Sequence, residues 1–331
     1  MTFIDFNDNN RASYGLAVEE YVMTNPLFKD EYFLLWHTNP TIVIGRYQTT
    51  LNEINSTYVK ENNVSVVRRR SGGGAMYQDP NGLQFCFISW KSHQKETKTN
   101  LFRQYSAPIV EALNLMGVEV VFSGRNDLML NNKKFSGNSQ YSIGERFLHH
   151  GTLLFDSNLE NLVKALNVGD EKIISKGIQS VKERVINLRP YLNNPEMSFE
   201  EFRAEITAIV SKQMPTITFT TEQIKEIEEL ERSKYLSWDW VYGKSPMFNI
   251  FHKKKLEGGM IEFNFNVKEG VISECSIRGD FFYTGEIEEL ENIFVGLRYE
   301  KEWIIEALLS NESKISCFNF ITLSELVEMF K

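Results

Sequence analysis

The segment RRRSGGGAMYQD, residues 68–79, constrains this chain more than any other feature of its sequence. Its three consecutive glycines, Gly72, Gly73 and Gly74, can adopt backbone angles closed to other residues. Amide groups can therefore converge on an anion, and a ligand can lie against bare backbone. A glycine-rich hairpin loop would also explain an isolated triplet. The arginines before it, the Tyr-Gln-Asp after it and the predicted strands on both sides favour a binding site for phosphate or carboxylate.

The loop does not belong to the common nucleotide-binding motifs. A P-loop needs Lys-Ser or Lys-Thr at the start of a helix, and a Rossmann fingerprint is also missing. The net charge of -8 argues against general nucleic-acid binding, which requires a basic face that replaces the counterions of the phosphates. Any phosphate recognition must therefore be local, and the densest basic cluster is Arg68, Arg69 and Arg70.

Short apolar runs rich in β-branched and aromatic residues predict strands. They lie at residues 32–37, 41–45, 64–68, 83–90 and 118–124. Helical periodicity predicts helices at 13–23 and 101–116, the second of them ending at Gly117. Residues 126–155 are typical of three strands joined by two turns, and the pattern is mostly helical from 159 to 233.

The length of 331 residues predicts one large domain and a smaller one. The composition changes at residues 237–246. Beyond it, two strands joined through 268–270 and helices at roughly 285–295, 299–309 and 322–330 are enough for a small α+β domain. We therefore predict an α+β protein with a large domain of residues 1–245 and a small domain of residues 246–331.

Several classes of protein are excluded by simple features. No apolar run approaches the roughly 18 residues of a membrane span, and the first residues do not resemble a signal peptide, so we expect a soluble cytoplasmic protein. Cys86, Cys275 and Cys317 are far apart and form no C-x-x-C pair. Neither a zinc site nor a disulfide framework is indicated.

Two further segments carry candidate binding residues. In SGRNDLMLNNKKFSGNSQ, residues 123–140, Asp127 could accept a hydrogen bond from an adenine amino group or a ribose hydroxyl, and Lys134 could place a positive charge between a carboxylate and a phosphate. In RFLHHGTLLF, residues 146–155, strand alternation puts His150 and Thr152 on one face and His149 on the other. Carboxylates and cysteines at metal-ligand spacing are missing, so these histidines do not predict a metal site.

Together with KGIQSVKERVINL at 176–188, these motifs resemble, in order and spacing, the lipoate-protein ligase family of the biotin/lipoate attachment superfamily. The similarity spans most of residues 10–245, and the trailing domain resembles the accessory domain of the longer ligases. The resemblance implies a large mixed-sheet catalytic domain and a two-step reaction. Lipoate attacks ATP to give lipoyl-AMP, and a lysine of a lipoyl carrier protein then accepts the lipoyl group. Magnesium would accompany ATP, with ligands that the motifs do not assign.

Matching the motifs residue by residue implies roles for individual side chains. Lys134 would be the catalytic residue, acting electrostatically on both acyl carbonyl and phosphate. The lipoyl group would be bound by Trp36, Arg69, Ser71, Gly72, Gly73, Gly74 and His150. The adenylate would be bound by Gly74, Tyr77, Gln78, Asn126, Asp127, Lys134 and Thr152. Residues 176–185 would form a loop that closes over the intermediate. Many members carry histidine at the position of Gln78, and glutamine cannot shuttle a proton.

Rival functions remain at this point. An ATP-independent octanoyl or lipoyl transferase would rely on a cysteine, but Cys86 lies between Phe85 and Phe87 and is typical of a core residue. An enzyme that uses only preformed lipoyl-AMP is an intermediate case. A non-catalytic lipoate-binding protein would not need both Lys134 and Asp127, and the G-R-G-R-x-G loop of biotin ligases is missing.

The resemblance leaves the substrates open in two respects. The carrier could be a lipoyl domain of a 2-oxoacid dehydrogenase or a glycine-cleavage H-type protein. Lipoate and octanoate both stay candidates, because an apolar slot discriminates by only about 1–3 kcal/mol per methylene-sized difference. We expect a monomer.

Overall fold

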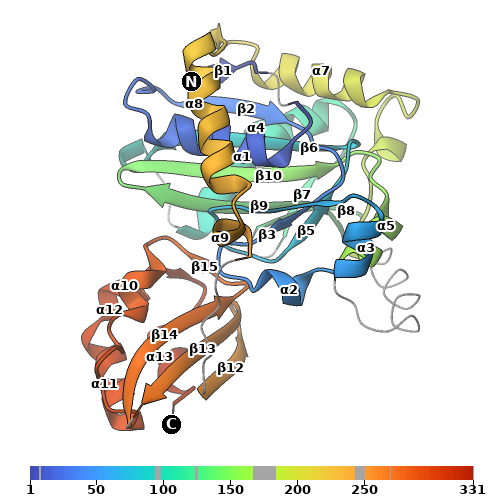
Figure 1. Cartoon of the computed structure of the whole chain (residues 1–331). Coiled ribbons are helices and arrows are strands. Elements are labelled where there is room, and N and C mark those ends of the chain that lie inside the picture. The colour runs from blue at the N-terminus through green and yellow to red at the C-terminus, as the bar shows by residue number, and fades with distance from the viewer. Residues whose placement is uncertain are drawn as a thin grey trace.

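The large domain is built on an eight-stranded sheet with the strand order β11-β1-β2-β6-β10-β9-β8-β7 (Figure 1). The structure is a computed structural model, and it describes all residues except 7–8, 94–97, 124–125, 167–183, 243–249, 269 and 331. The strands are β1 (Thr2–Ile4), β2 (Tyr32–Trp36), β6 (Gly82–Trp90), β7 (Val121–Ser123), β8 (Asp127–Leu130), β9 (Lys133–Ile143), β10 (Arg146–Leu154) and β11 (Thr216–Ile217). β1 runs parallel to β2 and β11, and the other neighbours are antiparallel. The predicted mixed sheet is confirmed.

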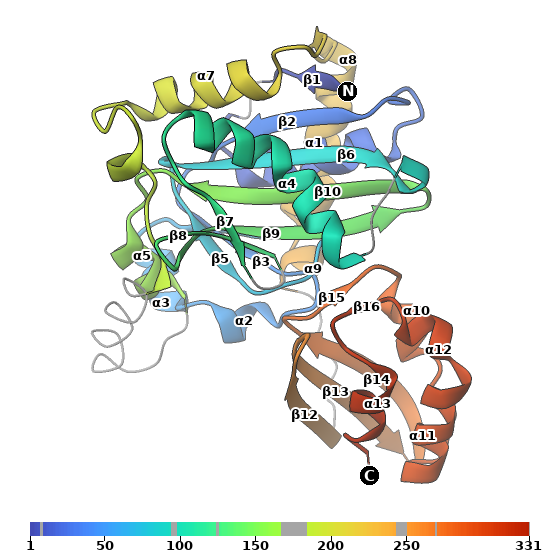
Figure 2. The ribbon, with the colours of Figure 1, turned by 180° about the vertical axis from the view of Figure 1, so that it is seen from behind.

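Helices cover both faces of this sheet. α1 (Ala12–Thr24) and α8 (Thr221–Leu230) lie on one face, and α4 (Lys98–Leu115) and α7 (Phe199–Val210) lie on the other (Figures 1 and 2). Alternation along β6 supplies both cores, because Cys86 and Ile88 pack towards α1 whereas Phe85 and Phe87 pack towards α4. A strand buried on both faces reads as a continuous apolar run, which is how residues 83–90 appear in the sequence.

A second, three-stranded sheet lies beside the first and carries the glycine triplet. Its order is β4-β3-β5, with β3 (Thr41–Ile44) parallel to β4 (Ser65–Arg68) and antiparallel to β5 (Met76–Gln78). The triplet lies in the connection from β4 to β5. Short helices α2 (Thr50–Glu53), α3 (Ser56–Glu61) and α5 (Leu159–Ala165) accompany this sheet. Further helical segments described before the small domain are η1 (Lys91–His93), η2 (Arg189–Tyr191), η3 (Glu231–Tyr235) and α9 (Trp238–Val241).

The small domain has a hydrophobic core of its own. Its three-stranded sheet contains β12 (Ile250–Leu256), β13 (Gly259–Lys268) and β14 (Val271–Gly279), and a two-stranded sheet pairs β15 (Phe282–Tyr283) with β16 (Phe318–Asn319). Its helices are α10 (Ile287–Glu291), α11 (Lys301–Ser310), α12 (Glu312–Ile315) and α13 (Leu323–Val327). The predicted pair joined through 268–270 is present, but β12 was missed because its run of lysines hides the alternation. Our boundary at 245/246 lies outside the described residues and stays a proposal.

The small domain packs directly against the glycine triplet. The Gly73 amide donates to the Phe281 carbonyl at 3.1 Å, and the Gly279 amide donates to the Tyr47 carbonyl at 3.0 Å. The rings of Tyr47 and Phe281 stack with centroids 4.8 Å apart. A Cβ atom at Gly72 would lie 2.3 Å from the Phe281 carbonyl oxygen, so this approach needs a residue without a side chain.

No helix in the described part of the chain is long and apolar enough to cross a membrane.

Candidate functional site

Strand register gathers chemically distinctive side chains on one face of the large sheet. Trp36 on β2 pairs with Gln84 on β6, and Gln84 pairs with Thr152 on β10. Two residues along the same strands, His150 pairs with Cys86 and with Ser139 of β9. Because side chains alternate along a strand, both rows project from the same face. The prediction that His150 and Thr152 share a face is in agreement with this register.

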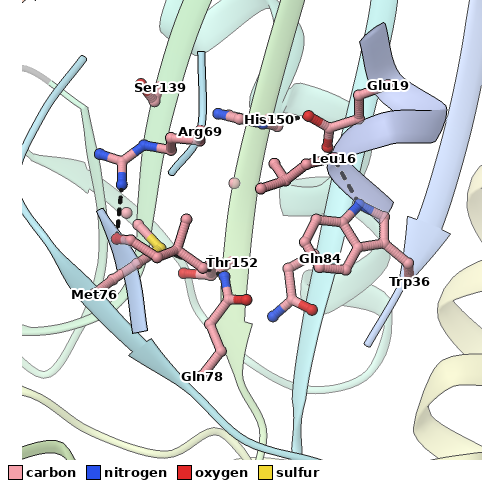
Figure 3. Close-up of a pocket in the computed structure, with 13 residues that line it drawn as sticks. Leu16, Glu19, Trp36, Arg69, Met76, Gln78, Gln84, Ser139, His150 and Thr152 are labelled. Carbon is pink, nitrogen blue, oxygen red and sulfur yellow. Dashed lines mark hydrogen bonds and ion pairs between the residues drawn. The ribbon is translucent and has the colours of Figure 1, made fainter. Parts of the chain in front are cut away.

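These rows form one wall of a cavity between the large sheet, α1 and the three-stranded sheet. About 330 Å³ of space in this cavity and at its opening to solvent is not filled by protein atoms. The residues that line it are Leu16, Glu19, Trp36, Val43, Arg69, Met76, Gln78, Gln84, Gly137, Ser139, His150, Gly151 and Thr152 (Figure 3). An apolar cavity with a few oriented polar groups is typical of sites for small ligands that have an apolar body.

A buried chain of hydrogen bonds ties α1, β2, β10 and the β4–β5 connection together at this wall. Glu19 of α1 accepts from the Trp36 indole at 3.2 Å and lies 2.9 Å from Nδ1 of His150. Nε2 of His150 lies 2.7 Å from the Ser71 hydroxyl, which also accepts from Nε of Arg69 at 3.1 Å. With Nδ1 protonated, His150 donates to Glu19 and accepts from Ser71. Glu19 and Arg69 then carry opposite charges at the two ends of the chain, which offsets the cost of burying each of them.

The order serine, histidine, glutamate is that of a nucleophile, a base and an orienting acid. Ser71, however, is 0% exposed, and its hydroxyl is already engaged by both Arg69 and His150. A nucleophile must reach its substrate, so this serine has a positioning role. Together the chain fixes Trp36 and His150 in the wall of the cavity.

The three consecutive arginines go to three different environments. Arg68 is buried among backbone carbonyls, and Arg70 forms an ion pair with Glu20 at 2.9 Å. Arg69 donates from Nη2 to the carbonyls of Gly72 and Gly74 at 2.7 and 2.9 Å. Burial lowers the pKa of Arg69 to about 10, which still leaves it charged at neutral pH. The three arginines therefore do not form a joint phosphate-binding cluster. Arg69 instead shapes the glycine loop.

Lys134 lies at the Gly137 end of the cavity. Its Nζ is 2.8 Å from Oδ1 of Asp127, and the two side chains are 41% and 34% exposed. A Cβ atom at Gly137 would lie 2.9 Å from this Nζ, which places the ammonium group beside that residue. The backbone amide of Ile186 donates to the Lys134 carbonyl at 3.0 Å. A half-exposed cation thus stands at the border between the apolar cavity and solvent.

The other predicted site residues surround this end or point elsewhere. The Asn126 side chain donates to the Asn138 carbonyl at 2.6 Å, next to Asp127. Strand alternation sends the Tyr77 ring away from Gln78 and into a separate cluster with Ile42, Ile44 and Ile54. Residues 176–183 of the predicted closing loop lie outside the described residues.

Sequence reasoning missed the cavity residues Leu16, Glu19, Val43, Met76, Gln84, Gly137, Ser139 and Gly151. Glu19 had no distinguishing signal, because a glutamate in a helix is ordinarily solvated, and this one is 1% exposed. Gln84 could have been found only from strand pairing with Trp36 and Thr152. A pattern of residues along one strand does not reveal the neighbours of that strand.

Two observations limit the chemistry of the site. Burial raises the pKa of the Cys86 thiol well above its ordinary value, so it is not a thiolate nucleophile. Among the residues that the structure describes, no group of three or more histidine, cysteine, aspartate or glutamate side chains could hold a metal ion.

His149, on the opposite face from His150, should make the fold sensitive to acid. It is fully buried, and this burial lowers its pKa to about 3. In the unfolded chain it would titrate near 6.5, so it favours the folded state above that pH, and this contribution is lost as the pH falls towards 3. Below about pH 6, the unfolding free energy of the wild type should fall with decreasing pH more steeply than that of His149→Gln. We expect the two slopes to differ by about 1.4 kcal/mol per pH unit. Urea titrations at several pH values in this range would measure the unfolding free energies. An equal dependence on pH in both proteins would contradict the prediction.

Comparisons with known proteins agree with the geometry. The family model described as lipoyl protein ligase A/B catalytic domain matches residues 11–211, and the bacterial lipoate protein ligase C-terminus model matches 245–330. The chain is 39% identical over 313 residues to lipoate-protein ligase LplJ of Bacillus subtilis, covering 93% of each chain. It is also 39% identical over 310 residues to lipoate-protein ligase 1 of Staphylococcus aureus, again covering 93% of each. Plasmodium falciparum LipL1, solved in complex with lipoate, superposes with a TM-score of 0.79 at 25% identity, covering 99% of this chain and 98% of that one.

Proposed function

The chain belongs to the lipoate-protein ligase family, and on this premise we propose how its residues bind lipoate and ATP and transfer the lipoyl group. It is an ATP-dependent lipoate-protein ligase. The first step joins the lipoate carboxylate to the α-phosphate of ATP and releases pyrophosphate. In the second step the amine of a carrier lysine attacks the acyl carbon and releases AMP.

The observation that carries the proposed orientation is the position of Lys134 at one end of an apolar cavity. Lys134 and Gly137 both lie on β9, and the Lys134 Nζ is beside Gly137. Trp36 lies three strands away on β2. Neighbouring strands are about 4.8 Å apart, so the cavity spans roughly 14 Å. The lipoate carboxylate would lie by Lys134, where its charge is matched. The dithiolane ring would lie towards Trp36, where apolar surface leaves water.

Lys134 would act by charge alone. At the border of the cavity it could contact both the acyl carbonyl and the α-phosphate, and stabilise the negative charge that develops on each. Its pairing with Asp127 holds the ammonium group in place without a substrate.

The adenylate would lie on the solvent side of Lys134. We assign it to the Gly74 and Tyr77 backbone and to the side chains of Gln78, Asn126, Asp127 and Thr152. The Tyr77 ring points away from the cavity, which is why its main chain is the group that we propose. Gln78 has an unpaired Oε1 among the described residues, but its amide cannot transfer a proton.

The lipoyl slot would be formed by Trp36, Arg69, Ser71, the glycines Gly72 to Gly74, and His150. Glu19 joins this set because it holds both Trp36 and His150. The role of Arg69 is to fix the carbonyls of the glycine loop.

We also propose that magnesium accompanies ATP. The ion commonly uses one or two carboxylates together with substrate phosphates and water, so a single protein carboxylate can suffice. Asp127, half-exposed beside Lys134, fits as a carboxylate ligand. The metal would neutralise phosphate charge as pyrophosphate leaves.

We infer that the acceptor is a lipoyl carrier protein, as an archaeal lipoate protein ligase of the same fold was solved with its E2 lipoyl domain. We propose a 2-oxoacid dehydrogenase lipoyl domain or a glycine-cleavage H-type protein as the carrier, a monomeric ligase and a cytoplasmic location. The ATP-independent transferase is disfavoured by the buried Cys86, whose pKa is raised.

The test of the activation step is lipoate-dependent exchange of labelled pyrophosphate into ATP, with purified protein and magnesium. Exchange that requires lipoate would support independent activation. A well-folded protein that lacks exchange, but modifies a lipoyl domain when given preformed lipoyl-AMP, would restrict the function to transfer.

A further inference from the structure

Gln84 is a buried polar residue in the cavity wall without a partner. The residue is 4% exposed, and neither Nε2 nor Oε1 of its side chain has a hydrogen-bond partner among the described residues. Buried amides are nearly always hydrogen-bonded, because an unpaired one retains its desolvation cost. Figure 3 shows the Gln84 side chain near Trp36 and Gln78, and all three residues line the cavity. A ligand in the cavity is therefore the natural partner.

The position of Gln84 selects which part of the substrate it meets, if the proposed orientation of lipoate holds. Gln84 lies on β6, two strands from β9, where Gly137 stands beside Lys134. Two strand spacings are roughly 9–10 Å. In lipoate, four methylene groups separate the carboxyl carbon from the dithiolane ring, so an extended chain reaches about this far. The amide then meets the ring sulfurs and not the carboxylate.

We propose that Gln84 determines acyl specificity, by donating an N–H from Nε2 to a dithiolane sulfur of lipoate. Sulfur is a weak acceptor, but the alternative is a buried donor without any partner. The same cavity already contains such a contact, since Nε2 of Gln78 lies 3.4 Å from Sδ of Met76. Trp36 flanks the ring from the neighbouring strand and supplies apolar contact.

This arrangement selects against saturated acids. Octanoate has the same carboxylate and a similar length, but carbon and hydrogen cannot accept the Gln84 hydrogen bond. A site built for a hydrogen-bonding substrate disfavours an analogue that leaves its polar group unpaired. The enzyme should therefore favour lipoate over octanoate, although both fit an apolar slot.

The decisive comparison uses the cyclopentyl analogue of lipoate, in which methylene groups replace both ring sulfurs and the ring shape is kept. In pyrophosphate exchange we expect the wild-type kcat/KM for lipoate to exceed that for the analogue about tenfold. Gln84→Met, similar in size but without the amide, should reduce this ratio to about one to two. Gln84→Asn, which keeps a shorter amide, should give an intermediate ratio.

Leu16→Ile serves as the matched control, because Leu16 lines the same cavity with no polar group. It should change kcat/KM for both acids by the same factor. An unchanged ratio in Gln84→Met, or a wild-type ratio near one, would overturn the role of Gln84. The wild-type ratio decides the question even if Gln84→Met does not fold.

The experiment separates this proposal from the proposed function. Exchange with both acids at equal efficiency would defeat only the role of Gln84. If no acid supports exchange, activation fails, and the Kd values of lipoate and the cyclopentyl analogue by calorimetry still test the amide. Equal wild-type Kd values would then overturn it, and tighter lipoate binding that Gln84→Met abolishes would support it.

Discussion

Replacement of Lys134 with alanine should reduce lipoate-dependent pyrophosphate exchange about a hundred- to a thousandfold, the usual effect of removing one preorganised charge from a transition state. In the proposed orientation, the lysine lies where the acyl carbonyl and the phosphate can both contact one cation. The loss should be mainly in kcat, because the charge that Lys134 neutralises develops during the reaction. Transfer from preformed lipoyl-AMP to a lipoyl domain should fall as well.

Lys133→Ala is the matched control for this variant. The two lysines are adjacent on β9, and alternation sends their side chains to opposite faces. Lys133→Ala should keep exchange within about twofold of wild type, because the Lys133 side chain lies on the opposite face of β9 from Lys134. A Lys134→Ala protein with normal exchange would contradict the catalytic assignment of Lys134.

Arg68→Met should destabilise the large domain by about 3–5 kcal/mol, because it leaves several buried carbonyls without a donor. The Arg68 guanidinium donates from Nη1 to the carbonyls of Gly45 and Gln48 at 2.8 and 2.7 Å. It also donates to the carbonyls of Trp240 and Val241 at 2.9 and 3.0 Å. One side chain thus connects the segment after β3 to α9, across a long separation in sequence.

Urea unfolding followed by circular dichroism would measure this loss. Arg232→Met is the control, because Arg232 forms an ion pair with Glu229 while its own side chain is 74% exposed. Exposed pairs contribute little, so this variant should change stability by less than about 1 kcal/mol. If Arg68→Met cost no more than Arg232→Met, the hydrogen bonds of Arg68 would not be the connection that we infer.

Individual elements were predictable where the local pattern was strong. The helix expected at 13–23 is α1, Ala12–Thr24, and the strands expected at 126–155 are β8, β9 and β10. The basic strand β12 was not predicted, because lysines occupy both faces in its centre and leave no period-two signal. The short strand β11 was missed for a different reason, since its two residues pair with β1 only through a long-range contact.

The candidate site shows the same division. Trp36, Arg69, Gln78, His150 and Thr152 were predicted and line the cavity, whereas Tyr77 turns its ring away. The roles of Glu19 and Gln84 were not readable. Each depends on a residue far along the chain. Glu19 contacts His150, and Gln84 lies opposite Trp36 on the neighbouring strand.

The sequence by itself determined the periodicity of most strands and helices, the face of each strand on which a residue lies, and the motifs that identify the family. Those features depend on neighbours within a few residues, through backbone geometry and alternation. The tertiary structure alone decided that Arg68 is structural while Arg69 shapes the glycine loop, that the small domain binds the Gly73 amide, and that Gln84 faces the cavity unpaired. Strand pairing and burial set these properties, and both arise from contacts between segments that are distant in the chain.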